Sequence, residues 1–86
     1  MDTTLELIQK VKPLDYKKVL IETASKRYYS DLSEFESVQC FPESLEWNDV
    51  SIDSDGVDLI WGCRFEVHVT QVIDCAYKVE DLPQVS

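Results

Sequence analysis

Apolar residues in the first third of the chain recur every three or four positions, which is the period of an amphipathic helix. Leu5, Ile8 and Val11 accompany a Thr3-Thr4-Leu5-Glu6 segment that has the form of a capping box, and Pro13 ends the run. A second apolar stripe consists of Tyr16, Val19, Leu20, Ala24 and Tyr28. The pattern predicts two N-terminal helices, over about residues 4–12 and 14–29.

After Ser30 the apolar period changes to two. Every odd position from Val57 to Val69 is apolar, which predicts a long strand that Gly62 bends or interrupts with a bulge. Residues 73–79 repeat the alternation in a last strand. Asp55-Gly56 is typical of a hairpin turn, so residues 50–53 are expected to pair with the start of the long strand.

Two shorter signals complete the predicted fold. Residues 35–41 are interpreted as a further strand, and Pro42-Glu43 as the start of one helical turn. The sequence therefore predicts an α+β fold in a single domain over residues 1–86, with two N-terminal helices followed by an antiparallel sheet of four or five strands.

Charge is distributed unevenly along the chain. Lys and Arg number 8 and Asp and Glu number 17, which gives a balance of 8 − 17 = −9. No Lys or Arg lies between Arg27 and Arg64, a stretch that carries nine acids interleaved with apolar residues. We therefore expect a folded face studded with carboxylates rather than an acidic tail. Such a face repels nucleic acid and attracts basic surfaces.

Length and cysteine content limit the class of protein. With 44% hydrophobic residues, 86 residues provide one compact core and little room for a deep cavity. The three cysteines are an odd set without a close pair, which favours a reducing compartment. No apolar run approaches the roughly 20 residues of a membrane span, and the N-terminus lacks the pattern of a signal peptide. We expect a cytoplasmic protein that makes no contact with a membrane.

Metal ligands are present in the sequence but poorly spaced. Residues five apart on a straight strand face opposite sides, so Cys63 and His68 cannot share an ion without a bulge, and Cys75 is interpreted as a buried thiol. The segment Asp53-Ser54-Asp55-Gly56 resembles the middle of a calcium-binding loop, but Ser51 stands where the first carboxylate would be. The sequence predicts no metal or cofactor site.

Catalytic groups are not arranged for a reaction. His68, the only histidine, is expected to point to solvent, away from the thiols. Two glycines in the whole chain exclude a phosphate-cradling glycine loop. A small basic patch on the second predicted helix is more simply explained as an ordinary solvated face. We therefore expect that the protein is not an enzyme and does not bind nucleic acid directly.

One segment resembles a known family. In FESVQCFPES, residues 35–44, the order Glu36-Ser37-Val38 followed by Pro42-Glu43 is similar to a segment of the phage uracil-DNA glycosylase inhibitor family. In that family a Glu-Ser-Ile strand is followed three residues later by Pro-Glu at the start of a helix. Small size, strong acidity and helices that precede an antiparallel sheet are also similar.

The resemblance implies a docking strand. Glu36, Ser37 and Val38 would enter the DNA-binding groove of the glycosylase and take hydrogen bonds that DNA would otherwise make. Cys40 would help to line an apolar pocket that receives a leucine from the enzyme. Further acids would imitate phosphates, beginning with the reduced acidic helix that carries Glu43, Glu46 and Asp49.

The leading hypothesis is a phage-borne acidic inhibitor that imitates DNA in the basic groove of a host enzyme, with uracil-DNA glycosylase as the favoured target, in the cytoplasm of the host cell. An anti-CRISPR or anti-restriction protein would use the same principle. An immunity protein that neutralises a basic nuclease toxin fits the size and acidity equally well. The remaining alternative is an adaptor domain or subunit in which the acidity serves only solubility. In that case Glu36 would protect an edge strand against aggregation. Trp47 would then be a core residue rather than an interface anchor.

Overall fold

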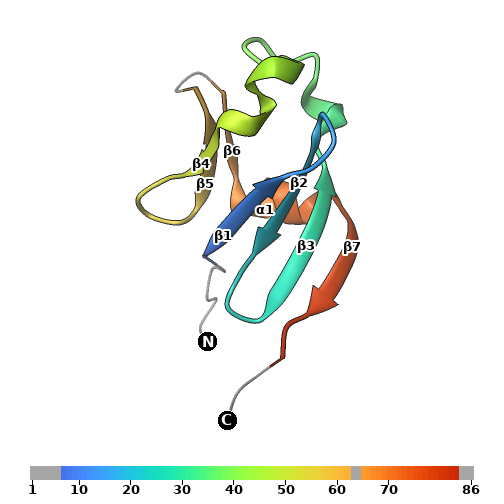
Figure 1. The fold of residues 1–86 in the computed structure, drawn as a ribbon, viewed down its shortest axis with the longest axis vertical. Helices are drawn as coiled ribbons and strands as arrows, with labels where there is room; N and C mark the ends of the chain where they lie inside the picture. Colours follow the sequence, from blue (N-terminus) through green and yellow to red (C-terminus); the bar gives the residue numbers. More distant parts are fainter. Residues whose placement is uncertain (1–6, 63–64, 84–86) are drawn as a thin grey trace.

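The computed structural model describes residues 7–62 and 65–83, which form two antiparallel sheets, two 3-10 helices and one short α-helix (Figure 1). A four-stranded sheet, in the order β1-β2-β3-β7, consists of Lys10–Pro13, Lys18–Glu22, Lys26–Asp31 and Ala76–Asp81. A three-stranded sheet, in the order β4-β5-β6, consists of Val50–Ile52, Asp58–Trp61 and Phe65–His68. The 3-10 helices η1 and η2, Ser33–Phe35 and Ser44–Asp49, lie between β3 and β4, and the α-helix α1, Val69–Asp74, joins β6 to β7.

The predicted pair of N-terminal helices is wrong, because the described residues of that region form β1, β2 and β3. In β2, Val19 and Ile21 are fully buried and alternate with more exposed neighbours. In β3, Tyr28 and Ser30 are buried and alternate in the same way. Tight turns at residues 15–17 and 23–25 shift the phase between these strands, so the apolar spacing across them imitates a helix. β-Branched and aromatic side chains favour the strands. The Thr3–Glu6 capping box lies outside the described residues.

The first part of the predicted sheet is confirmed. Val50 pairs with Trp61 and Ile52 with Leu59, and the chain turns between them at Asp55 and Gly56, which has a φ of 75°. A helical turn also follows Pro42-Glu43, as predicted, because Glu43 is the N-cap residue of η2.

The predicted long strand over residues 57–69 is wrong. The chain reverses after β5 at Gly62, whose φ of 58° is a conformation that glycine adopts without strain, and Trp61 pairs with Phe65 of β6. Residues 69–74 then form α1, so the last strand begins at Ala76 rather than at Ile73. Residues 35–41 form no strand, because Phe35 is the last residue of η1 and turns follow it.

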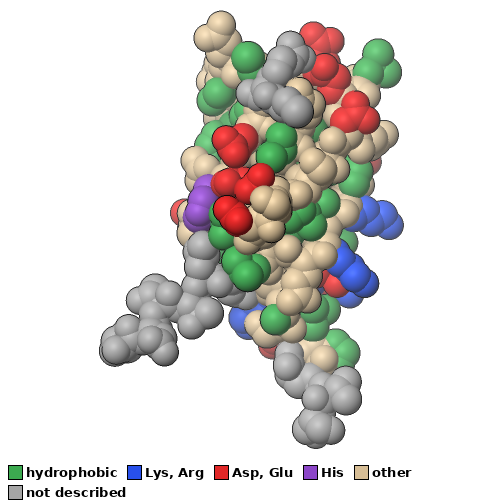
Figure 2. Space-filling model, turned by 90° about the vertical axis from the view of Figure 1, so that its left-hand side faces the viewer, with side chains coloured by type: hydrophobic (Ala, Val, Ile, Leu, Met, Phe, Trp, Pro, Cys, Tyr) green, Lys and Arg blue, Asp and Glu red, His purple; other side chains and the backbone are tan. Residues whose placement is uncertain are grey.

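The three-stranded sheet has one apolar and one polar face. Leu59 and Trp61 of β5 and Phe65 and Val67 of β6 are buried, so the residues that alternate with them point outward. Figure 2 shows this side of the molecule, where carboxylates gather over the sheet and cationic side chains lie toward the right-hand edge and the lower end.

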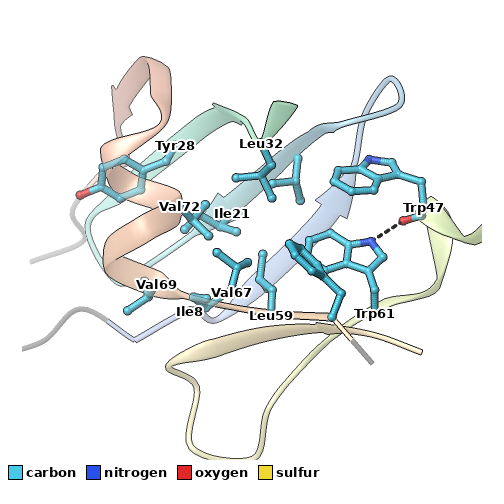
Figure 3. Close-up of a cluster of buried hydrophobic side chains, with 12 residues drawn as sticks. Ile8, Ile21, Tyr28, Leu32, Trp47, Leu59, Trp61, Val67, Val69 and Val72 are labelled. Atoms are coloured by element: carbon cyan, nitrogen blue, oxygen red, sulfur yellow. Dashed lines mark hydrogen bonds between the residues drawn. The ribbon is translucent and has the colours of Figure 1, made fainter. Parts of the chain in front are cut away.

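The core lies between the two sheets, and α1 packs against β3 and β6 at one end (Figure 3). Trp47 of η2 is 1% exposed and stacks on Trp61, with ring centroids 4.6 Å apart. The Trp47 indole donates a hydrogen bond to the Lys18 carbonyl oxygen at 2.7 Å, and the Trp61 indole donates to the Trp47 carbonyl oxygen at 2.9 Å. Trp47 is therefore a core residue that ties η2 to β2 and β5.

Candidate functional site

The predicted docking segment lies in a turn rather than on a sheet edge. Glu36 caps the C-terminal end of η1, and Ser37 and Val38 follow in exposed turn positions. Glu36 forms an ion pair with Lys17 of the β1–β2 turn, and this hydrogen bond is the main cause of the raised pKa of Lys17. The docking strand predicted over residues 36–38 is therefore absent, and the Glu36 carboxylate already has a cation beside it.

Cys40 is exposed in the same turn region and has a φ of 73°, which is uncommon for a residue other than glycine. A hollow of about 160 Å³ opens at a different place, over β1 and β2, and is lined by Lys10, Val11, Lys12, Leu20 and Glu22. Cys40 does not line this hollow.

The predicted acidic helix is present as η2. Glu43 and Glu46 form a capping box, in which the Glu43 amide donates to Glu46 Oε1 at 3.1 Å. These two acids therefore stabilise the start of η2. Asp49 is exposed at the other end, immediately before β4.

Sheet pairing brings further acids together. The Asp53 amide donates to the Asp58 carbonyl oxygen at 2.9 Å, and Asp58 is the register partner of His68. Asp53, Asp58 and His68 therefore form one row across the outer face of the three-stranded sheet. In the next row Ser51 pairs with Ile60, and Ile60 pairs with Glu66.

We use the name acidic face for five carboxylates on and around this surface. Asp53, Asp58 and Glu66 lie on the outer face of the sheet, Asp55 lies in the β4–β5 turn, and Asp49 lies immediately before β4. None of these five forms an ion pair with a residue that the structure describes. Of these five residues, only Asp49 was predicted from the sequence to contact a partner. Asp53 and Asp58 become neighbours only through the pairing of β4 with β5, whereas Asp55 lies in the predicted hairpin turn and the alternation around His68 already placed Glu66 on the same side of a strand as His68.

Cationic side chains lie on the other sheet. Seven of the eight Lys and Arg residues are described, and all seven belong to β1, β2, β3, β7 or the β1–β2 turn: Lys10, Lys12, Lys17, Lys18, Lys26, Arg27 and Lys78. Arg27 contacts Glu22 at 3.1 Å and Glu80 at 3.0 Å, and Lys26 contacts Asp81 at 2.6 Å. The hydrogen bond from Arg27 is the main cause of the lowered pKa of Glu80. Glu22, Glu80 and Asp81 of the four-stranded sheet are thus compensated within the molecule, in contrast to the acidic face.

Two of the three residues considered as metal ligands or nucleophiles, His68 and Cys75, lie within residues 7–62 and 65–83. The described His, Cys, Asp and Glu side chains form no group of three that would hold a metal ion. His68 lies on the outer face as expected, but it has a structural role, because the Thr70 amide donates to its Nδ1 at 3.2 Å at the start of α1. Burial raises the pKa of the Cys75 thiol to about 11, which opposes formation of a nucleophilic thiolate. Cys63, the third thiol considered, lies outside the described residues.

In this part of the chain, no helix has the length and apolar character needed to span a membrane. No protein-family model, no curated protein and no solved structure matches the chain.

Proposed function

We propose that this protein inhibits a DNA-processing enzyme by placing its acidic face in the enzyme's DNA-binding groove. The observation that carries the proposal is the separation of charge between the two sheets. Five carboxylates stand on and around the three-stranded sheet without an ion pair to a described residue, whereas the described cations belong to the four-stranded sheet and its β1–β2 turn.

The arrangement suits imitation of DNA on physical grounds. Like charges directly opposite one another on neighbouring strands are unfavourable for folding, so the Asp53–Asp58 pairing costs stability unless a cationic partner compensates it. DNA carries one negative charge per about 1.7 Å of its axis, and a protein groove that binds it is lined with cations. Carboxylates held on a sheet lose little conformational freedom on docking, and the net charge of −9 accelerates association with a basic groove.

Uracil-DNA glycosylase is the first target to test. The sequence likeness at Glu36-Ser37-Val38 and Pro42-Glu43 supports it, as do size and acidity. However, the helices that precede the sheet and the docking strand in that family have no counterpart in the described fold. We therefore assign the contact to the acidic face, with Glu43 and Glu46 of η2 beside it, rather than to residues 36–38.

Inhibition of uracil excision from duplex DNA tests the proposal. The double variant Asp53→Asn/Asp58→Asn removes two carboxylates from the acidic face. Asp15→Asn/Asp81→Asn removes two exposed carboxylates elsewhere, one from the β1–β2 turn and one from β7, for the same change in net charge. We expect inhibition competitive with DNA, weakened at least about tenfold by the first variant at low salt and less than about threefold by the second.

Two outcomes contradict different parts of the proposal. Continued excision at equimolar protein would eliminate the glycosylase as target, and the same variants would then be tested against a restriction nuclease, a CRISPR nuclease and a basic nuclease toxin. Equal effects of the two double variants on an enzyme that is inhibited would eliminate the acidic face as the contact.

A further inference from the structure

β7 forms one edge of the four-stranded sheet. It pairs with β3 on one side, and in residues 7–62 and 65–83 no strand pairs with its other side. Tyr77 and Val79 are 56% and 51% exposed, although they belong to a sheet. An edge of this kind presents unpaired amide and carbonyl groups to any strand that approaches it.

The direction of these backbone groups follows from the register. Lys26 pairs with Asp81, so the next pair along the ladder is Ser25 with Leu82. The Leu82 amide donates to the Ser25 carbonyl oxygen at 2.9 Å, so Ser25 and Leu82 form a hydrogen-bonded pair. Hydrogen-bonded and non-hydrogen-bonded pairs alternate along an antiparallel ladder, so Glu80 also points its backbone groups toward β3. Val79 and Asp81 therefore point their amide and carbonyl groups outward, to the open edge.

We infer that two copies of this chain associate through β7, as antiparallel neighbours related by a two-fold axis at Val79. Two Val79 residues would then exchange two hydrogen bonds across the axis. Lys78 of each copy would lie opposite Glu80 of the other, at positions where the side chains of an antiparallel pair come closest. The strand is thus complementary to itself in charge.

Charge selects this register among the neighbouring ones. An axis at Asp81 would place two aspartates opposite each other, and an axis at Lys78 or Glu80 would place two lysines or two glutamates opposite each other. Within one chain Lys78 Nζ lies 3.2 Å from Glu80 Oε2, and Glu80 also accepts from Arg27 at 3.0 Å. The dimer extends this ion-pair ladder across the axis and joins two four-stranded sheets into one.

The dimer leaves the acidic face free. β7 lies at the right-hand edge of the molecule in Figure 1 and β4, β5 and β6 lie at the left, so a partner enzyme and a second copy contact different surfaces. A contact through one strand buries much less than the roughly 1,200 Å² of a stable interface, so we expect a dissociation constant on the order of 100 μM.

Sedimentation equilibrium from about 10 μM to 1 mM protein in 150 mM salt measures the association. We expect the mean mass to rise from 10.0 kDa toward twice that value. Val79→Pro removes an amide that points outward and removes no hydrogen bond to β3, and proline is tolerated at such positions of edge strands. This variant should weaken association at least about tenfold. Val79→Thr retains the amide and the branched shape and should remain within about threefold of the wild type.

Opposite charge changes test the register itself. Lys78→Glu and Glu80→Lys each oppose like charges in their own homodimers, whereas an equimolar mixture restores two opposite-charge pairs and should associate at least about fivefold more tightly than either variant alone. Circular dichroism checks that each variant is folded. A wild-type protein that stays monomeric at 1 mM, or a folded Val79→Pro variant that associates as strongly as the wild type, would overturn the inference.

Discussion

Replacing Trp61 by Phe tests how the two sheets are held together. The Trp61 side chain is 2% exposed, stacks on Trp47 and donates its indole hydrogen bond to the Trp47 carbonyl oxygen at 2.9 Å. Phenylalanine keeps one aromatic ring in the core but has no donor. The change therefore leaves a buried carbonyl group without this hydrogen bond and leaves part of the indole volume empty.

The expected loss of stability follows from these two effects. A buried polar group that loses its partner costs about 1–3 kcal/mol. Truncation of a buried Trp to Ala costs about 3–5 kcal/mol, and Phe retains most of that volume, so the space left behind adds about 1 kcal/mol. The sum, about 2–4 kcal/mol, is a large fraction of the roughly 4–13 kcal/mol typical of a domain of this size.

Urea unfolding monitored by circular dichroism measures the change, with the denaturant dependence of the unfolding free energy expected to stay constant. Tyr16→Phe is the control, because it removes a 2.8 Å hydrogen bond to the Pro42 carbonyl oxygen from a ring that is 40% exposed, and we expect it to cost less than about 1 kcal/mol. A loss in Trp61→Phe no larger than in the control would refute the central role of the tryptophan pair.

Two further predictions concern ionisable groups. The Ser33 amide, which donates to Asp31 Oδ1 at 2.9 Å, is the main cause of the lowered pKa of Asp31, so this carboxylate stabilises the fold above its unfolded pKa and the benefit is lost as pH falls through the lower folded pKa. The difference in unfolding free energy between the wild type and Asp31→Asn should be constant above about pH 5 and shrink below about pH 4, and a difference that grows on acidification would contradict this assignment. Cys75, whose pKa of about 11 leaves about one thiolate in a thousand at pH 8, should be alkylated far more slowly than the exposed Cys40 until urea unfolds the chain. Peptide mass spectrometry measures both rates, and equal rates in native buffer would show that Cys75 is not protected.

Local signals in the sequence were sufficient for short-range features. Asp55-Gly56 predicted the β4–β5 hairpin, because the turn depends on residues that are adjacent in the chain. Pro42-Glu43 predicted the start of η2 for the same reason. The excess of acids between Arg27 and Arg64 is likewise a property of composition, so the charge asymmetry of the molecule was visible without a structure.

Pattern alone did not distinguish strand from helix where elements are short. Strands of four to six residues, such as β1, β2 and β3, span too few repeats to separate a period of two from one of 3.6. The reverse error occurred at Val69 and Ile73, which the apolar alternation placed at the ends of two predicted strands and which belong to α1. Val69 and Val72 are buried against the core and His68 caps the first turn, so tertiary packing makes this segment a helix.

What the chain determined by itself was therefore its negative charge and the turns that adjacent residues specify. The tertiary structure decided which carboxylates meet: Asp53 and Asp58 become neighbours only through β4–β5 pairing, and Glu36 meets Lys17, 19 positions away, only when the β1–β2 turn approaches η1. Strand register sets these neighbours, and it depends on contacts between residues distant in sequence, to which local periodicity is insensitive.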